Sequence, residues 1–479
     1  MRWIQGTGPG TPIGIPWEAV GASAFNMQHS LEWMFKEMLD GSLKPVLAES
    51  WDVDTKAPSL TFHLRKGVKF HDGTDFNAAA VKWNLEKEMD PASTNYGSTT
   101  NWKSIEAVDT YTLRVNLKTW QNTALGTFAS MATTVISPTA FDKQGIDALR
   151  WKMVGTGPFV QTDFQRDVVL SFVKNPNYWQ QGLPYVDKLQ IIYSTELLTC
   201  AALLKSGGAD ILNCQGSIVT ANDVQAAGFK IVSQPAGTGG LGNLTPDSIN
   251  ADSPWSNVKV RMAAEYALDK ESMAKTFGMG YAVPAYQICA PSSPGNDPRL
   301  TPRKYDPTKA RQLLAEAGYP EGFPLSLSSS YQAEREAGII AAEWEKIGVR
   351  TKVTILPLSE IGSKLAAPKG NGFEFDVVAN LAPDLMAHVS FLAGICFYSG
   401  SPLSRLNDPE FDALYEKISS AIDPSVQLAA AKQLDALIYR EAWGIFTYQK
   451  IKNYAMKREL QIPISQNGIL DLRDAAWKR

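Results

Sequence analysis

The sequence lacks the features by which most membrane proteins and many enzymes are recognised. Its 479 residues contain no apolar run near the roughly 18 needed to cross a bilayer. Only four histidines occur, and no two stand four residues apart as in a helical zinc site. Neither a GxSxG elbow nor a GxxxxGK[ST] phosphate loop is present. Catalysis therefore has no recognisable local motif here, although many active sites leave none.

The chain also lacks an excess of charge of either sign. Lysine and arginine number 46 and aspartate and glutamate 49, which gives a net charge of −3. Such a balance provides no basic field for nucleic acid or an anionic membrane. We expect no nucleic-acid partner, no cofactor, no bound metal, and a monomer.

Cysteine is scarce, and none of the four residues has metal-site spacing. Cys200 and Cys214 either pair across a short loop or, with Cys289 and Cys396, are buried thiols. The start, MRWIQGTGPG, has no apolar signal-peptide core and no lipid-accepting cysteine. Either the protein is cytosolic or its export signal has been trimmed.

Length and aromatic content are more informative. A chain of this length exceeds a single core and suggests two or three domains. Thirteen tryptophans and sixteen tyrosines supply flat, semi-polar surface. Part of it belongs to the core, and part suits a hydrated pocket with apolar walls.

Local patterns predict alternating strands and helices, which favour mixed α/β domains. In the first part, a strand at 59–64 and a short one at 68–70 precede a helix over 78–88 capped by Asn77. The helix with the clearest start and stop signals covers 306–318, with Asp306 as N-cap, Pro307 in the first turn and Gly318 at its end. The other predicted strands are 105–108, 112–117, 189–193, 210–212, 230–233, 375–379 and 445–448, and the other helices 196–206, 221–227, 258–268 and 425–439.

Seven short sequence motifs along the chain resemble those of family 5 of the extracellular solute-binding proteins, the peptide, nickel and opine receptors of ABC importers. Each motif alone is weak evidence for the family, but the order of all seven is specific. The resemblance runs from about residue 43 to 450. They lie at 45–51 (PVLAESW), 62–73 (FHLRKGVKFHDG), 104–109 (SIEAVD), 154–159 (VGTGPF), 175–179 (NPNYW), 258–270 (VKVR to YALDK) and 305–320 (YDP to LAEAGYP).

The resemblance implies a bilobal, periplasmic-binding-protein-like class II α/β fold with an extra α+β domain. Lobe 1 would be discontinuous, built from 1–44, 156–244 and 455–479. The extra domain would cover 45–155, and lobe 2 would cover 245–454. The glycine run at 237–242 falls where such proteins cross between lobes, and its composition is typical of a hinge.

The resemblance also places the ligand between the lobes, and we assign candidate contacts on that basis. Asp384 either holds a ligand amino group or is a turn residue, and His388 either bonds a ligand or caps a helix. Trp17 is either a stacking wall or core. Residues 131–134 (MATT) carry no charge where some relatives place a basic residue, which argues against a carboxylate clamp. The full set is Trp17, Tyr96, Trp102, Met131, Asn243, Asn380, Leu381, Asp384, Met386, His388, Phe397 and Tyr398.

The implied function is capture of a peptide or other small organic solute and its delivery to a membrane permease. Such a receptor is periplasmic or a cell-surface lipoprotein, and it works by lobe closure rather than chemistry. Two alternatives remain open. One is a hydrolase or metalloenzyme using the same cleft, and the other is a ligand sensor for a signalling partner.

Overall fold

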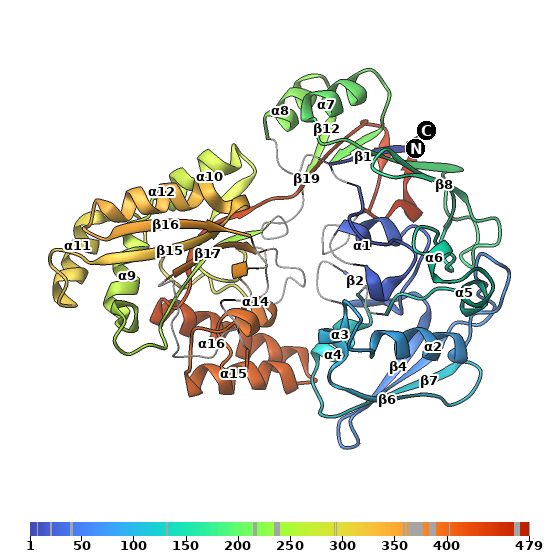
Figure 1. The fold of residues 1–479 in the computed structure, drawn as a ribbon, viewed down its shortest axis with the longest axis horizontal. Helices are drawn as coiled ribbons and strands as arrows, with labels where there is room; N and C mark the ends of the chain where they lie inside the picture. Colours follow the sequence, from blue (N-terminus) through green and yellow to red (C-terminus); the bar gives the residue numbers. More distant parts are fainter. Residues whose placement is uncertain are drawn as a thin grey trace. The chain divides into compact units, whose positions relative to one another are not determined.

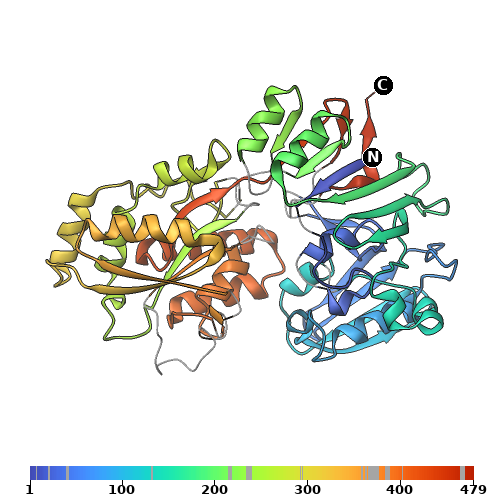
Figure 2. The same ribbon diagram turned by 45° about the horizontal axis from the view of Figure 1, so that its top comes forward.

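The chain forms two compact units, each with its own sheets and cores. In the computed structural model, unit 1 comprises Met1–Ser233 and Asn453–Arg479, and unit 2 comprises Gln234–Lys452. Both termini belong to unit 1 and lie near each other (Figures 1 and 2). The structure describes all residues except 7, 20–21, 39–41, 131–132, 214–217, 234–239, 292, 294, 358–359, 362–363, 365–376, 383–388, 402, 464–469 and 479.

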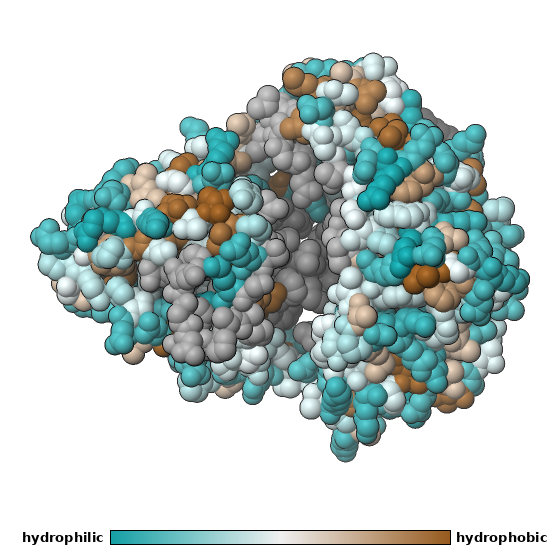
Figure 3. Space-filling view, in the orientation of Figure 1, coloured by the Kyte–Doolittle hydropathy of each residue, from teal (hydrophilic) through white to brown (hydrophobic). Residues whose placement is uncertain are grey.

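The surface of each unit is mixed in polarity. On the face that Figure 3 shows, hydrophilic residues predominate among those described, and hydrophobic ones are scattered between them. Scattered apolar residues are normal on a folded protein and need no special role. Surface hydropathy therefore does not distinguish a binding site on this face.

Unit 1 is built on a seven-stranded mixed sheet. Strand β1 pairs in parallel with β10 on one side and β11 on the other, and the remaining pairs are antiparallel. Strand β19, from the C-terminal part of the chain, lies between β11 and β12. In spatial order the strands are β12 (Lys230–Ser233), β19 (Asn453–Met456), β11 (Ile211–Asn213), β1 (Arg2–Gln5), β10 (Lys188–Tyr193), β9 (Val169–Lys174) and β8 (Phe159–Gln165).

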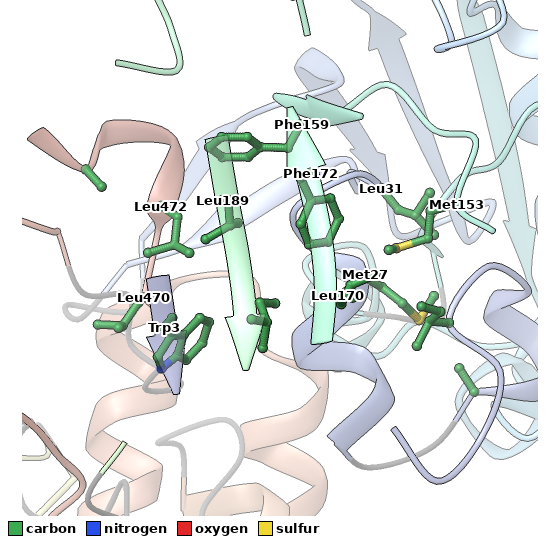
Figure 4. Close-up of a cluster of buried hydrophobic side chains, with 14 of the residues drawn as sticks. Trp3, Met27, Leu31, Met153, Phe159, Leu170, Phe172, Leu189, Leu470 and Leu472 are labelled. Atoms are coloured by element: carbon green, nitrogen blue, oxygen red, sulfur yellow. The ribbon is translucent and has the colours of Figure 1, made fainter. Parts of the chain in front are cut away.

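The core of this sheet combines distant segments. Trp3, Leu189 and Phe172 project from β1, β10 and β9, and Leu470 and Leu472 pack beside them (Figure 4). Burial of such side chains is the main favourable contribution to folding. The C-terminal residues are therefore an integral part of unit 1.

A second, four-stranded antiparallel sheet belongs to unit 1. Its strands are β4 (Ala48–Asp54), β5 (Ser59–Leu64), β7 (Thr112–Leu117) and β6 (Trp102–Ala107), in that order. Alternate residues of β7 are buried, as expected for a sheet with one covered face. Helix α2 (Ala78–Glu88) packs on β6 and β7, and Asn77 caps it by accepting a hydrogen bond from the Ala80 amide at 3.0 Å.

Unit 2 contains a six-stranded sheet with helices against both faces. Helices α9 (Val258–Tyr266), α10 (Lys270–Gly278), α11 (Pro307–Glu316) and α12 (Glu334–Glu345) share one core with it. Helices α14 (Val389–Cys396), α15 (Pro409–Ser420) and α16 (Pro424–Glu441) form the other. The strand order is β14 (Ala282–Pro284), β18 (Ile445–Lys450), β13 (Leu241–Pro246), β17 (Val377–Ala382), β15 (Pro324–Ser330) and β16 (Arg350–Leu356).

The remaining elements are short. They are η1 (Pro16–Glu18), α1 (Ala22–Met27), β2 (Phe35–Glu37), β3 (Leu43–Pro45), α3 (Tyr96–Thr99), α4 (Thr123–Thr127), α5 (Pro138–Gln144), α6 (Ile146–Leu149), α7 (Leu197–Lys205), α8 (Ile218–Ala226), η3 (Pro254–Ser256), η4 (Tyr331–Ala333), β20 (Leu460–Gln461), η5 (Leu472–Asp474) and β21 (Ala476–Trp477). Across the described residues, no helix is both long and apolar enough to cross a membrane.

Most predicted elements are confirmed within one or two residues. Asp306 accepts a hydrogen bond from the Lys309 amide at 2.8 Å, as an N-cap should. The predicted strand at 68–70 is wrong, because only one isolated bridge forms there, between Lys69 and Asp75. The boundaries predicted for the two lobes and the extra domain stay a prediction.

A buried ionic network fastens the C-terminal part of unit 1 to its N-terminal part. Arg473 lies 3.5 Å from Glu32 and 2.8 Å from Asp471, which also pairs with Lys36. Tyr178 donates to Glu32 at 2.7 Å. Burial raises the pKa of Glu32, an effect that Arg473 and the hydrogen bonds only partly oppose.

The ionic network lines a small cavity in unit 1. Its volume is about 50 Å³, far below the roughly 300 Å³ at which pockets for organic ligands begin. Opposite charges within the network are matched, two cations with two carboxylates. We therefore treat it as a structural feature rather than a ligand site.

Candidate functional site

The carboxyl ends of three parallel strands define one edge of the unit 2 sheet. Strands β15, β16 and β17 end there at Ser330, Leu356 and Ala382. Strand β13 begins at the same edge, because its Leu241 pairs with Ala382 of β17. Leu241 also pairs with Gln449 of β18, so the end of β18 lies there too. In open α/β sheets, ligands bind outside the carboxyl ends of the strands.

Asn243 lies close to this carboxyl edge on β13 and is buried. Its Nδ2 donates to Thr245 Oγ1 at 3.3 Å and to Cys396 Sγ at 3.6 Å. Its Oδ1 has no partner among the described residues. A buried carbonyl oxygen without a donor is costly, so this atom is available to a water or a ligand donor. Its predicted ligand role stays a prediction.

Cys396 lies beside Asn243 as a free thiol. Burial raises the pKa of its thiol to about 11, against the smaller effects of Thr245 and Asn243. Only a thiolate is strongly nucleophilic, and at neutral pH this group is a thiol. Cys200, on α7 in unit 1, is also a buried thiol, and its Sγ donates to the Ser194 carbonyl at 3.4 Å. Cys214 lies outside the described residues.

An exposed aromatic residue at the unit 2 carboxyl edge was not among the predicted contacts. Tyr331 directly follows β15, and 66% of it is exposed. Its aromatic ring offers a flat apolar face, and its hydroxyl is a hydrogen-bonding group. Nothing in the sequence distinguishes it from the other tyrosines, because its position depends on how β15 pairs within the sheet.

The two residues of the predicted aromatic wall at 397–398 differ in burial, and their ligand role stays a prediction. Phe397 is fully buried and packs against Phe411 with ring centroids 6.0 Å apart, so it belongs to the core. Tyr398 is half-buried, lies 4.5 Å from the Tyr415 ring and donates to Glu416 at 3.2 Å. Of this pair, only Tyr398 remains a candidate for ligand contact.

In unit 1, the carboxyl ends of β1, β10 and β11 form the corresponding edge. They place Gln5, Tyr193 and Asn213 together. The Tyr193 hydroxyl donates to Asn26 Oδ1 at 2.8 Å. Leu198, on α7 directly after β10, is 81% exposed. The strand ends at this edge therefore carry uncharged polar side chains, and the start of α7 adds the exposed carboxylate of Glu196 and the exposed apolar side chain of Leu198.

Two predicted contacts of unit 1 are buried in its hydrophobic clusters, and their ligand role stays a prediction. Trp102 is 2% exposed and stacks on Phe128 with ring centroids 5.3 Å apart. Trp17 is buried against Trp83 and Phe141, and its ring centroid lies 5.7 Å from that of Trp83 and 6.0 Å from that of Phe141. Both fill hydrophobic clusters, which explains why indole rings are there. Neither has an exposed face for stacking on a ligand.

Tyr96 differs from these tryptophans, because it begins α3 and is 38% exposed. Asn380 and Leu381 lie on β17, paired with Asn243 and Gly242. The remaining predicted contacts, Met131, Asp384, Met386 and His388, lie outside the described residues. Within the described ranges, no three His, Cys, Asp or Glu side chains are grouped as metal ligands would be.

Comparisons with known proteins identify the family. Residues 42–396 match the bacterial extracellular solute-binding proteins, family 5. The glutathione-binding protein GsiB of Escherichia coli (strain K12) is 33% identical over 360 residues, which cover 73% of this chain and 67% of that protein. GsiB of Salmonella choleraesuis (strain SC-B67) is 33% identical over 342 residues, 70% of this chain. That match spans 64% of the Salmonella protein's own length.

Solved structures confirm the predicted α/β fold class. HbpA2 from Haemophilus parasuis matches this chain with a TM-score of 0.87 and 22% sequence identity. NikA from Brucella suis in complex with Fe(III)-EDTA matches it with a TM-score of 0.84 and 24% sequence identity. DppA from Helicobacter pylori in complex with peptide STSA has 0.79 at 21%. The alignments cover 100% of this chain and 98–99% of those chains. The chain therefore belongs to family 5 of the bacterial extracellular solute-binding proteins.

Proposed function

We propose that this chain is the receptor of an ABC importer, and that it captures a peptide or other small organic solute. Membership of family 5 carries the proposal. The polar carboxyl edge present in each unit supports it, since ligands of α/β sheets bind at such edges. The captured solute would then pass to a membrane permease, outside the cytoplasm.

The mechanism in this proposal is conformational. A ligand that binds one conformation of the receptor better than the others stabilises that conformation, and no covalent bond is made or broken. The chain passes between the units twice, after Ser233 and before Asn453. Only these two connections would have to change conformation on closure.

The described strand ends supply mainly uncharged polar side chains for contact with a ligand, with the exposed carboxylate of Glu196 close by in unit 1. In unit 1 the strand ends supply Gln5, Tyr193 and Asn213. In unit 2 the edge includes Lys450, whose ammonium lies 3.8 Å from Glu336 and is thereby matched by a carboxylate. Amide groups of a short peptide match such side chains. GsiB, which is named for binding glutathione, makes glutathione the first peptide to test.

The experiment is native mass spectrometry of freshly purified protein, followed by a thermal-shift panel. The panel contains glutathione, di- and tripeptides with uncharged side chains, and neutral organic solutes. A true ligand at 100 times its dissociation constant adds about 2.7 kcal/mol of stability. The ligand is recovered after incubation, and its molecular mass is measured by mass spectrometry. Recovery with unchanged mass supports a receptor, whereas conversion to a product would establish an enzyme instead. A panel without any stabilising solute would contradict capture.

A further inference from the structure

A second hollow surface lies in unit 2, among helices α9, α15 and α16 (elements labelled in Figure 1). Its volume is about 830 Å³, which falls within the roughly 300–1,000 Å³ of small-molecule sites. We call it the α15–α16 groove. It is lined by the apolar residues Met262, Leu300, Ala413, Leu414, Ala436 and Leu437, and by Arg303, Glu410, Lys417, Gln433, Tyr439 and Arg440.

The α15–α16 groove is separate from the carboxyl edge of unit 2. Helix α16 ends at Glu441, just before β18 begins at Ile445. Ile445 pairs with Leu244, and the far end of β18 reaches the carboxyl edge at Lys450. Tyr439 and Arg440 therefore lie at the opposite end of β18 from that edge. A ligand in the groove would not compete with one at the edge.

A buried ion-pair cluster lies next to the groove. Glu265 accepts from Lys270 at 3.3 Å and from Arg303 at 2.6 Å, and all three side chains are buried. Burial lowers the pKa of Lys270 and so disfavours its charged form. Arg303 also donates to the Tyr439 carbonyl at 2.6 Å and faces the Tyr439 ring at 4.0 Å. An anion near Arg303 would add a second counter-charge to this buried guanidinium.

The rim of the groove carries an excess of positive charge. Three cationic side chains, Arg303, Lys417 and Arg440, line it against one anionic side chain, Glu410. Arg440 is matched by Glu410 at 3.0 Å and by Glu441 at 2.8 Å. Lys417 makes no ion pair with any residue that the structure describes. Its ammonium is thus available to a ligand carboxylate.

We propose that the α15–α16 groove binds a small organic anion with a rigid apolar body, such as an aromatic carboxylate. The body would cover Leu414 and Leu437, and the carboxylate would face Arg303 and Lys417. Apolar lining with a few placed charges is the usual composition of small-molecule sites. This site is independent of the capture function proposed above.

The test is isothermal titration calorimetry of the full chain with 1-naphthoate and its neutral isostere 1-naphthamide. Naphthoate is expected to bind once per chain, and naphthamide roughly tenfold more weakly because it lacks the charge. Ala413→Phe fills the groove from the exposed face of α15 and is expected to abolish binding. Lys417→Glu is expected to remove the preference for naphthoate over naphthamide.

Matched variants keep the test specific. Ala429→Phe adds the same ring to an exposed position of α16 that does not line the groove, and Lys275→Glu reverses an exposed charge on α10. Both are expected to bind naphthoate as the unmodified chain does, and so is Tyr331→Ala. Equal affinity for the two probes, or full binding by Ala413→Phe, would overturn the proposal. Loss of binding in Tyr331→Ala would also overturn it, by placing the probe at the carboxyl edge.

Discussion

The buried carboxylate of Glu88, at the end of α2, accepts a hydrogen bond from the Ser93 hydroxyl at 2.6 Å. Asn95 Nδ2 lies 3.2 Å from the same carboxylate and 3.1 Å from the Pro16 carbonyl. Glu88 thereby orders the segment that leads into Tyr96 and joins it to the backbone around η1. Among the residues that the structure describes, none with a positive charge contributes to this arrangement.

Glu88 is expected to make stability depend on pH. Burial raises its pKa from 4.5 to about 7, although Ser93 and Asn95 oppose the shift. The folded chain then holds this proton more tightly than the unfolded chain. Stability from this group is greatest at low pH and falls as pH rises from 4.5 to 7.

Glu88→Gln tests this linkage. The variant is expected to lose less unfolding free energy between pH 5 and pH 8 than the unmodified chain, by roughly 1–3 kcal/mol. Urea unfolding at the two pH values measures the difference. Glu86→Gln, on the exposed side of α2, is the control and should follow the unmodified chain. Parallel pH profiles for Glu88→Gln and the unmodified chain would disprove the linkage.

Asp435 on α16 is expected to behave similarly in unit 2. It is fully buried, its Oδ1 accepts weakly from the Cys289 amide at 3.4 Å, and its Oδ2 has no partner among the described residues. Burial raises its pKa from 3.8 to about 7. Asp435→Asn is therefore expected to stabilise the chain at pH 8, by roughly 1–3 kcal/mol, and hardly at pH 4.

Chemical unfolding at pH 4 and pH 8 measures the effect of Asp435→Asn. The exposed Asp252→Asn serves as its control and should change stability by less than about 0.5 kcal/mol at either pH. If Asp435→Asn instead destabilises the chain at pH 8, the charged carboxylate is needed there.

Arg473 is expected to be essential for unit 1. Arg473→Met leaves Glu32 buried without its cation and removes one of the two cations of Asp471. Breaking a buried ion pair in this way costs about 3–5 kcal/mol. Urea unfolding is expected to show that loss, whereas Arg114→Met on the exposed side of β7 should be nearly neutral. A loss below about 1 kcal/mol would show that the ionic network contributes little.

Tyr331 and Leu198 are expected to contribute to ligand affinity without contributing to stability. Both are largely exposed, so Tyr331→Ala and Leu198→Ala remove no core contact. With the ligand identified by the thermal-shift panel, each is expected to weaken binding about 3- to 10-fold, the scale of one aromatic or apolar contact. Calorimetric titration measures the change. Unaltered affinity in both variants would place the ligand elsewhere.

Local structure was largely predictable from the sequence, because its causes are local. The amide that Asn77 caps is three residues away, and Asp306 and Pro307 begin α11 for the same short-range reasons. The period-two burial of β7 is likewise visible in its residues. These features need no knowledge of the rest of the chain.

The candidate site was predicted less well, because it depends on pairings between distant strands. Trp17 and Trp102 have the composition of ligand-stacking residues, yet packing against Trp83 and Phe128 buries them. Tyr331 gains its position only from the pairing of β15 with β16 and β17. Burial of an aromatic side chain is a tertiary property, and single-sequence patterns do not determine it.

The place of β19 within the unit 1 sheet has a consequence for synthesis on the ribosome. Residues 453–456 fill the position between β11 and β12, so those two strands have no common neighbour until nearly the whole polypeptide has emerged. Every strand of unit 2 precedes them in the chain. During translation, the second unit can therefore complete its sheet first, while the first waits for the final stretch of its polypeptide.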